Sequence, residues 1–255
     1  MSGTRLTFLG TGTSQGVPMI GCGCEVCRST DPRDKRLRAS VLVEHEGLKI
    51  LVDAGPDFRY QMLRAGVTSL DAILLTHNHK DHTGGLDDIR AFNYHEKKAT
   101  QIYCEQYVED SLKKEYSYAF EEIKYPGAPD WNVHIIDEKP FSINGVEIVP
   151  IRGRHFKLPV LGYRFGNIAY CTDMNHIREE EFSKLQGLDH FIINCVRRGR
   201  HISHYSLEQA IEVAQKTGAG HSWLTHLSHQ IPCHEELIRE LPEGILPAYD
   251  GLVLE

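Results

Sequence analysis

The sequence predicts a mixed α/β fold in which two β-sheets lie face to face between outer helices, a four-layer αββα sandwich. Three observations predict it. Short runs of apolar and β-branched residues recur along the whole chain, with no internal repeat and no Pro/Gly/Ser-rich linker between them. Early runs are joined by tight turns such as Glu46-Gly47, and Asn144-Gly145 follows later, which favours antiparallel hairpins. The later runs alternate with stretches of helical spacing, which favours sheets covered by helices.

The individual elements follow from the period of the apolar residues. Short β-branched runs predict strands at residues 6–9, 40–44, 48–53, 72–76, 146–151, 161–165, 167–172, 190–195, 222–225 and 251–254. Helical spacing predicts helices at residues 58–65, 86–92, 108–120, 178–185, 207–216 and 234–241.

The chain is long enough, at 255 residues with 41% apolar and 25% charged residues, to bury a substantial core, and we expect one domain over residues 1–255. Residues 94–131 interrupt the recurring pattern of short apolar runs with a helical segment that is rich in tyrosine and phenylalanine. An inserted surface helix that packs on the body is favoured there over a substrate lid or a homodimer contact. The sequence leaves these three readings open.

Composition narrows the location and the partners. The first ten residues lack a secretory pattern, and no apolar run approaches the roughly 20 residues that cross a bilayer, so we expect a soluble cytoplasmic protein without a membrane partner. The formal net charge of −7 argues against a nucleic-acid partner, because such binding needs a basic face. Fifteen histidines are many for this length and favour metal binding.

The densest group of candidate ligands follows the expected strand at 72–76. It reads Thr76-His77-Asn78-His79-Lys80-Asp81-His82-Thr83-Gly84-Gly85. In an extended chain alternate residues point to one side, so His77, His79 and Asp81 can converge while His82 faces elsewhere. The two glycines allow a sharp turn into the helix expected near Leu86. The pattern indicates two ligands for one metal ion and two for a second, rather than a solvated polar loop.

This motif resembles the H-x-H-x-D-H motif of the metallo-β-lactamase superfamily, and later residues fit the same family. The resemblance implies the αββα fold and two metal ions with a bridging oxygen nucleophile. The first ion would be held by His77, His79 and His155. The second would be held by Asp81, His82 and His226, and Asp173 would bridge the two. Asp53 matches an early aspartate that orients a histidine, although plain turn capping is the alternative.

The expected chemistry follows from such a pair of ions. Two divalent ions, Zn²⁺ or Mn²⁺, about 3.5 to 4 Å apart lower the pKa of a shared water and neutralise charge on an attacked ester or phosphate. Asp81 would position the resulting hydroxide, and His204 is the candidate acid that protonates the leaving alkoxide. Alternatively, His204 is solvated and Ser206 merely caps the next helix. A basic turn nearby could hold a phosphate or be solvated; it contains Arg197, Arg198 and Arg200.

Three of the seven cysteines are crowded into Cys22, Cys24 and Cys27, a spacing that suits one metal ion. The other four look like reduced, mostly buried thiols. A tetrahedral zinc needs a fourth ligand, for which His229 is the natural choice. With four protein ligands this zinc would be structural, and it would pin the N-terminal loop beside His226.

The cysteine cluster narrows the resemblance to the phosphoribosyl cyclic phosphate phosphodiesterases. The likeness also includes residues 10–18, His155-Phe156-Lys157, Thr172-Asp173, Ser203-His204 and the segment 225–230. It implies a hydrolase that acts on a small phosphodiester, cyclic ones included. Three alternatives remain: an enzyme similar to the tRNA 3′-end-processing endoribonuclease, a lactonase or thioesterase of the same superfamily, and a non-catalytic metal-binding protein. The last is disfavoured because all seven ligands of the dinuclear site are present.

Overall fold

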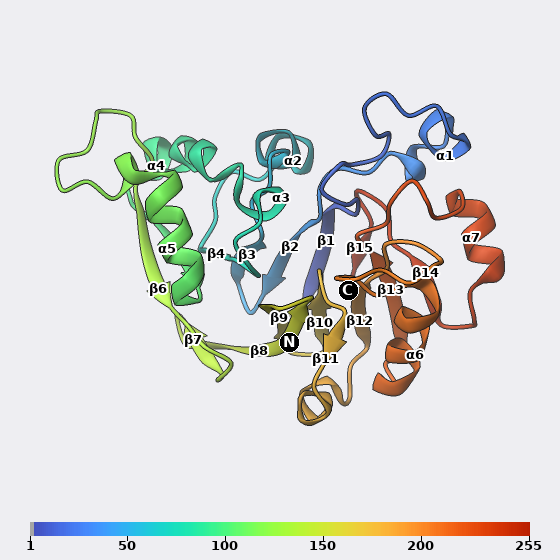
Figure 1. Cartoon of the computed structure of the whole chain (residues 1–255). Coiled ribbons are helices and arrows are strands. Elements are labelled where there is room, and N and C mark those ends of the chain that lie inside the picture. Colours follow the sequence, from blue (N-terminus) through green and yellow to red (C-terminus); the bar gives the residue numbers. More distant parts are fainter. Residues whose placement is uncertain (1–2) are drawn as a thin grey trace.

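The computed structural model describes residues 3–255, which form two β-sheets that pack face to face (Figure 1). Within those residues the first sheet has the strand order β15-β1-β2-β3-β4-β5-β6. The second has the order β11-β8-β9-β10-β12-β13-β14, with β7 paired to β8. The strands are β1 Arg5–Gly10, β2 Ser40–His45, β3 Leu48–Val52, β4 Ala72–Leu74, β5 Thr100–Cys104, β6 Trp131–Ile135, β7 Phe141–Ile143, β8 Val146–His155, β9 Leu158–Phe165, β10 Ile168–Cys171, β11 His176–Ile177, β12 His190–Asn194, β13 His221–Thr225, β14 Ile245–Pro247 and β15 Val253–Leu254.

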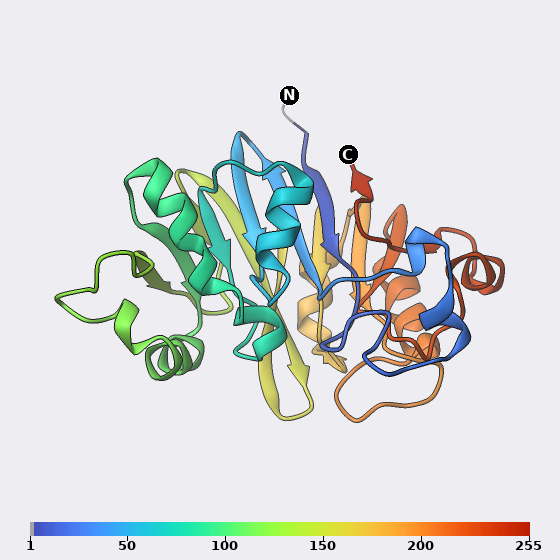
Figure 2. The ribbon, with the colours of Figure 1, turned by 90° about the horizontal axis from the view of Figure 1, so that it is seen from above.

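The helices lie on the outer faces of the two sheets (Figures 1 and 2). The α-helices are α1 Glu25–Arg28, α2 Phe58–Ala65, α3 Lys80–Thr83, α4 Arg90–Glu96, α5 Gln106–Glu115, α6 Leu207–Thr217 and α7 His234–Glu240. Single turns of 3₁₀-helix are η1 Pro32–Asp34, η2 Leu86–Ile89 and η3 Ser117–Ala119, and η4 Glu179–Leu185 is longer. Among residues 3–255, no helix combines the length and apolar character that crossing a membrane requires.

Three hydrophobic clusters define the four layers. The central cluster lies between the sheets and contains Phe8, Val52 and Tyr163 among its fully buried members. A second cluster joins the first sheet to α2 and α5, and a third joins the second sheet to α6 and α7. Each sheet therefore buries both faces, which explains why most strands read as short continuous apolar runs. The predicted αββα sandwich is confirmed.

The strand pairing agrees with the prediction that early strands form antiparallel hairpins and later strands alternate with helices. Strands β1, β2 and β3 are antiparallel, and Glu46 and Gly47 at the β2–β3 turn have φ of 48° and 87°. Strands β3 to β6 are parallel, as are β10, β12, β13 and β14. Since parallel strands end at the same edge of a sheet, their carboxyl ends gather the polar residues that follow them.

Some predicted elements differ from the structure. The helix predicted at 178–185 is the 3₁₀-helix η4, and the one at 86–92 is divided between η2 and α4. Residues 94–131 contain strand β5 and helix α5 and end at the first residue of strand β6, and both strands belong to the first sheet. The sequence did not predict these strands because β5 pairs with β4 and β6 pairs with β5, and each partner is distant in the sequence.

The last strand returns to the first sheet and closes the fold. β15 pairs antiparallel with β1, so Arg5 and Glu255 lie close, with 3.5 Å between Nε and Oε1. The carboxylate of Asp250 accepts hydrogen bonds from the backbone and hydroxyl of Thr11 and from the backbone of Leu37, at 2.8 to 2.9 Å. One buried side chain thereby holds three distant segments together.

Candidate metal centre

The predicted ligands lie at strand ends contributed by both sheets. His77 follows β4 of the first sheet, whereas His155, Asp173 and His226 end or follow β8, β10 and β13 of the second. Asp173 and His226 have left-handed backbones, with φ of 57° and 54°. Such φ values are uncommon for residues other than glycine and concentrate at functional sites.

The motif segment does not stay extended as far as predicted. Helix α3 begins at Lys80 with His79 as its N-cap, so Asp81 and His82 are helical. Gly84 and Gly85 have negative φ. They are needed for space, because a Cβ on Gly85 would lie 2.2 Å from the carbonyl oxygen of Gly55. The predicted turn is present. Glycine is required there because a side chain would collide with the neighbouring backbone, and not because the backbone is left-handed.

Three groups of side chains bring metal-binding atoms within 4.8 Å of one another, and Asp173 belongs to all three. Its partners are His77 with His82, His155 with His204, and Asp81 with His226. His79 lies beside these groups, with its ring centroid 4.6 Å from that of His77 and 4.9 Å from that of His155. The structure therefore brings together all seven residues predicted for the dinuclear site, around one carboxylate.

The donor set fits divalent metal ions. Within this group of side chains, five buried ring nitrogens have no hydrogen-bond partner among residues 3–255: His77 Nε2, His82 Nε2, His155 Nδ1, His204 Nδ1 and His226 Nδ1. A buried polar atom without a partner costs about 1 to 3 kcal/mol, so their grouping around buried carboxylates needs a compensating interaction. Imidazole and carboxylate ligands suit zinc, manganese and iron, and a cation satisfies both kinds of atom.

The electrostatics of the group keep Asp173 and His77 unprotonated, whereas the carboxylates around His82 raise the pKa of that histidine. Burial alone raises the pKa of Asp173, but the adjacent His226 and His82 outweigh burial and hold that pKa well below its usual value. Burial also lowers the pKa of His77 well below its usual value, and His82 adds to the effect. A carboxylate and a neutral imidazole are the forms that bind metal ions.

Asp53 supports His82 from behind, as predicted. The His82 Nδ1 and Asp53 Oδ2 atoms lie 2.6 Å apart, and both side chains are fully buried. Thr76 donates from its backbone and its hydroxyl to the same carboxylate, each at 2.9 Å. With Nδ1 turned to Asp53, His82 Nε2 lies 3.1 Å from Asp173 Oδ2. The contact confirms orientation of a histidine, and Thr76 is a supporting residue that the sequence analysis missed.

Asn194 is a second missed residue. Its buried side-chain amide exchanges two hydrogen bonds with the backbone of Met174, at 2.7 and 2.9 Å. This contact anchors the chain immediately after Asp173, where the backbone is left-handed. In the sequence, the role of Asn194 is indicated only by the position of a side-chain amide at the end of an apolar strand. Such a position is weak evidence for a particular role.

The cysteine cluster forms a separate group. Cys22, Cys24, Cys27 and His229 place their metal-binding atoms within 4.8 Å of one another, as predicted from their spacing. The Nδ1 atom of His229 lies 3.3 Å from Cys22 Sγ and 3.5 Å from Cys24 Sγ. A backbone hydrogen bond from Cys27, followed by the contact with His229, lowers the pKa of Cys24 to about 6, which favours its thiolate. The backbone of Leu227 donates to Thr11 O at 2.8 Å, so the N-terminal loop is also tied to the strand that carries His226.

His204 lies inside the ligand group. Its ring centroid is 4.5 Å from that of His155 and 4.8 Å from that of His226, and its Nδ1 is 3.7 Å from Asp173 Oδ1. Burial lowers the pKa of His204 to about 3, which favours the neutral imidazole. Ser206 caps α6 through a capping box with Gln209, as the alternative reading expected. His204 is nevertheless mostly buried beside the ligands and not solvated.

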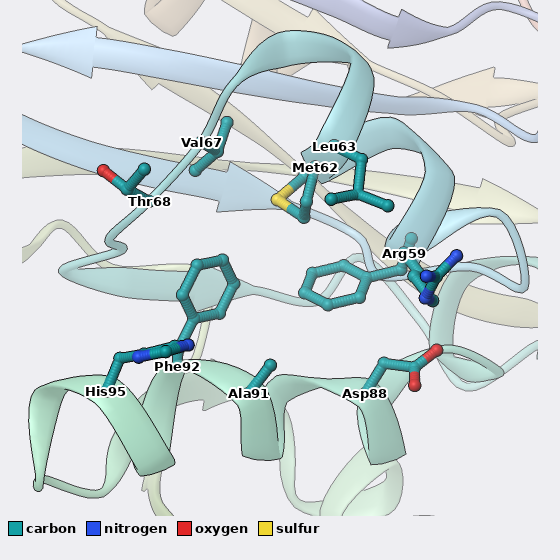
Figure 3. A pocket seen from close by; sticks show the side chains of 10 residues that line it. Arg59, Met62, Leu63, Val67, Thr68, Asp88, Ala91, Phe92 and His95 are labelled. Carbon is teal, nitrogen blue, oxygen red and sulfur yellow. The ribbon is translucent and has the colours of Figure 1, made fainter.

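A larger apolar cavity lies elsewhere on the molecule. It has a volume of about 540 Å³ and lies between α2 and the η2–α4 segment, where Met62, Leu63, Val67 and Phe92 line it (Figure 3). None of the predicted metal ligands lines this cavity. The candidate ligands and this apolar cavity are therefore separate features of the molecule.

Comparison with known proteins agrees with this geometry. The model of the β-lactamase superfamily domain matches residues 49–227, which include the motif, His155, Asp173 and His226. The chain belongs to the metallo-β-lactamase superfamily. A crystal structure of a diphosphatase from the PhnP family superposes with a TM-score of 0.92 at 39% identity, covering 98% of this chain and 96% of that one. Within the superfamily, this chain groups with the PhnP family, as the cysteine cluster predicted.

Two curated relatives extend the comparison. The octanoyltransferase of Porphyromonas gingivalis is 45% identical over 251 residues, covering 97% of this chain. This chain spans only 51% of that protein's length. Ribonuclease Z of Pyrobaculum neutrophilum is 24% identical over 290 residues, with 95% of this chain and 93% of that protein covered. The superfamily, the diphosphatase and ribonuclease Z support a hydrolase, and the cluster of histidines and aspartates supports the binding of divalent metal.

The support that Asp53 gives His82 can be tested with Asp53→Asn. Asparagine tolerates the left-handed φ of 65° at this position, but it has no negative charge and only one acceptor oxygen, so it cannot accept from both Thr76 and His82 as the carboxylate does. We expect the affinity for divalent metal to fall about 10- to 100-fold, measured by competition with a chromogenic chelator. Asp71→Asn, at a carboxylate that only accepts from the Lys49 backbone, is the matched control. Equal metal affinity in both variants would contradict the assignment.

Proposed function

We propose that this protein hydrolyses a small phosphodiester, cyclic ones included, with two divalent metal ions, Zn²⁺ or Mn²⁺, at the candidate centre. The observation that carries the proposal is the position of Asp173, which one strand end places within reach of ligand groups from both sheets. The first ion would be held by His77, His79 and His155, the second by Asp81, His82 and His226, with Asp173 between them. Such ions would lower the pKa of a water molecule and neutralise negative charge on the phosphate.

The protein's own residues have separable tasks in this proposal. Asp81 is 13% exposed in its side chain, unlike the fully buried His82, so one of its oxygens can accept a hydrogen bond from the attacking water. Asp53 and Thr76 fix His82 from the opposite side. His204 lies beside the ligand group and would protonate the leaving oxygen, a role that requires a bound anionic phosphate to raise its lowered pKa.

The similarity to ribonuclease Z supports RNA processing less well. An arm that clamps RNA needs excess positive charge to neutralise phosphates. The segment 94–131, which interrupts the strand pattern of the sequence, has eight acidic and five basic residues and so offers no such excess. A small substrate therefore fits the charge distribution better than a polynucleotide.

Activity assays distinguish the proposal from its alternatives. The panel contains cyclic and linear phosphodiesters, a pre-tRNA, a lactone and an octanoyl thioester. The thioester is included because a relative about twice as long is an octanoyltransferase. Preferential cleavage of the lactone or thioester would overturn the phosphodiester proposal, and cleavage of pre-tRNA alone would favour the ribonuclease.

Asp81→Ala provides the direct test of the centre. Since Asp81 acts on a metal and the attacking water and not on the core, we expect kcat for a phosphodiester to fall at least about 1,000-fold with little change in melting temperature. Asp137→Ala, at an exposed turn outside the centre, is the matched control. Near-native turnover by the Asp81 variant, measured with metal-saturated enzyme, would refute the assignment.

A structural zinc at Cys22, Cys24, Cys27 and His229 predicts that Cys24→Ser lowers zinc by about one ion per chain. The melting temperature should also fall, because a bound structural ion contributes folding free energy. Elemental analysis of purified protein measures the first effect and calorimetry the second. Cys233→Ser is the control, since Cys233 packs beside the cluster without belonging to it. Unchanged zinc in the Cys24 variant would exclude this site.

His204→Ala separates protonation of the leaving group from other roles. If His204 donates a proton, the rate should fall about 10²- to 10⁴-fold for an alkyl leaving group and far less for p-nitrophenolate. The measurement is kcat/KM over a series of leaving groups of decreasing pKa, at full metal occupancy. A uniform loss across the series would assign His204 to phosphate binding, and a lowered melting temperature alone would assign it a structural role.

A further inference from the structure

The hairpin between β8 and β9 turns at a residue that such a turn does not favour. Strand β8 ends at His155 and β9 begins at Leu158, so Phe156 and Lys157 make a two-residue turn. The φ of Phe156 is 56°. The common two-residue hairpin turns need a positive φ at this first position and take glycine, asparagine or aspartate there. For a bulky residue such a φ is an outlier that costs free energy.

Core packing does not explain why phenylalanine occupies this turn. Phe156 is 50% exposed, and within residues 3–255 it belongs to none of the hydrophobic clusters. The Nζ atom of Lys157 lies 5.5 Å from the centroid of its ring, so an exposed cation accompanies the exposed ring. Strained backbone that does not serve packing is typical of functional sites.

Ile202 is a second exposed apolar side chain beside the metal centre. It is 67% exposed and lies two residues before His204, in the loop between β12 and α6. The tip of the β8–β9 hairpin and this loop project on the same side of the molecule, opposite the termini (Figure 2). They meet at the ligand group, where the ring centroids of His155 and His204 are 4.5 Å apart. Phe156 and Ile202, here called the rim pair, therefore flank the candidate metal centre.

Asn175 connects the two segments that carry the rim pair. The backbone N–H of Phe156 donates to Asn175 Oδ1 at 3.1 Å, and Asn175 Nδ2 donates to Ile202 O at 2.8 Å. The backbone N–H of Asn175 donates to Arg154 O at 2.8 Å, where β11 pairs with β8. One side-chain amide thus uses its acceptor on the hairpin and a donor on the loop. The backbones of the rim pair are held on either side of a residue two positions after Asp173.

The rim pair lies where the ester groups of a bound phosphodiester would emerge. The ligand group is polar and largely buried, so a phosphate that reacts there leaves its ester groups outside the group. The chain passes from the buried ligand His155 to the half-exposed Phe156 within one residue. Exposed apolar side chains at the edge of a polar site can desolvate the apolar face of a ligand.

We propose that Phe156 and Ile202 determine substrate specificity by binding an ester group of the substrate, and that Asn175 is the positioning residue that sets them apart. The inference rests on the proposed phosphodiester hydrolysis. It selects diesters in which an ester group presents a flat apolar face, such as an aromatic ring, over those with small alkyl groups. The ring of Phe156 stacks on that face, and the Ile202 side chain covers it from the loop.

The experiment compares diphenyl phosphate and dimethyl phosphate as inhibitors of bis(p-nitrophenyl) phosphate hydrolysis, at full metal occupancy. Both inhibitors carry one negative charge, and they differ only in their ester groups. In Phe156→Ala, we expect the inhibition constant of diphenyl phosphate to rise about 5- to 20-fold and that of dimethyl phosphate to change less than about twofold. Phe156→Tyr keeps the ring and should keep the wild-type constants. Ile202→Ala and Asn175→Ala should weaken diphenyl phosphate selectively, as Phe156→Ala does.

Phe156→Asn separates recognition from a structural role. Asparagine suits the positive φ of the turn, so the melting temperature should rise by about 1 to 4 °C while selectivity for diphenyl phosphate is lost. A lowered melting temperature with wild-type selectivity would assign Phe156 to folding and overturn the inference.

Tyr94→Ala is the matched control, because Tyr94 is an exposed aromatic residue on α4 with Lys97 Nζ 4.2 Å from its ring centroid. Its two inhibition constants should equal those of the wild type. If Phe156→Ala keeps the wild-type ratio of the two constants, or if Tyr94→Ala changes that ratio equally, the specificity role is excluded. If the wild type cleaves no phosphodiester, the proposed function fails. Calorimetric titration of the metal-loaded wild type and variants with both inhibitors then decides the role of Phe156 by the same comparison.

Discussion

The fold is organised around a group of buried imidazoles and carboxylates that the protein alone does not satisfy. Ring nitrogens of His77, His155 and His226 are buried without hydrogen-bond partners, and Asp173 is held as an anion among them. In a protein interior such atoms oppose folding unless a cation joins them. The surrounding layers can be understood as a rigid frame that keeps these donors close despite this cost.

The two sheets can hold the ligands together because strands of both sheets end beside the metal centre. Parallel strands of both sheets point their carboxyl ends toward the centre, and the tip of the β8–β9 hairpin reaches the side of the molecule opposite the termini (Figure 2). The chain reverses sharply at these ends, with left-handed backbone at Asp53, Asp173 and His226. Backbone strain of this kind persists only where packing and hydrogen bonds enforce it, as Asn194 does after Asp173.

The sequence predicted the parts of this arrangement that are local. A dense run such as His77 to His82, or three crowded cysteines, reveals its chemistry without long-range information. The assignment of His155, Asp173 and His226 depended on family resemblance, since a single histidine or aspartate at a strand end has many ordinary roles. Thr76 and Asn194 were missed because their roles depend on which backbone the fold brings opposite them. Strands β5 and β6 escaped for the same reason, as did the helical turn at Asp81, where tertiary packing overrides the extended pattern.

The pairing of β15 with β1 places the two ends of the described chain beside each other, on the side of the molecule remote from the metal centre (Figure 2). Adjacent ends mean that a short linker can join them, so the order of the strands along the chain can be permuted without changing the sandwich. The exposed turn at residues 121–127, which contains none of the predicted ligands, offers a place for the new ends. A domain joined to the described chain beside β1 or β15 would likewise be attached on the side remote from the metal centre and would leave the approach of a small substrate open.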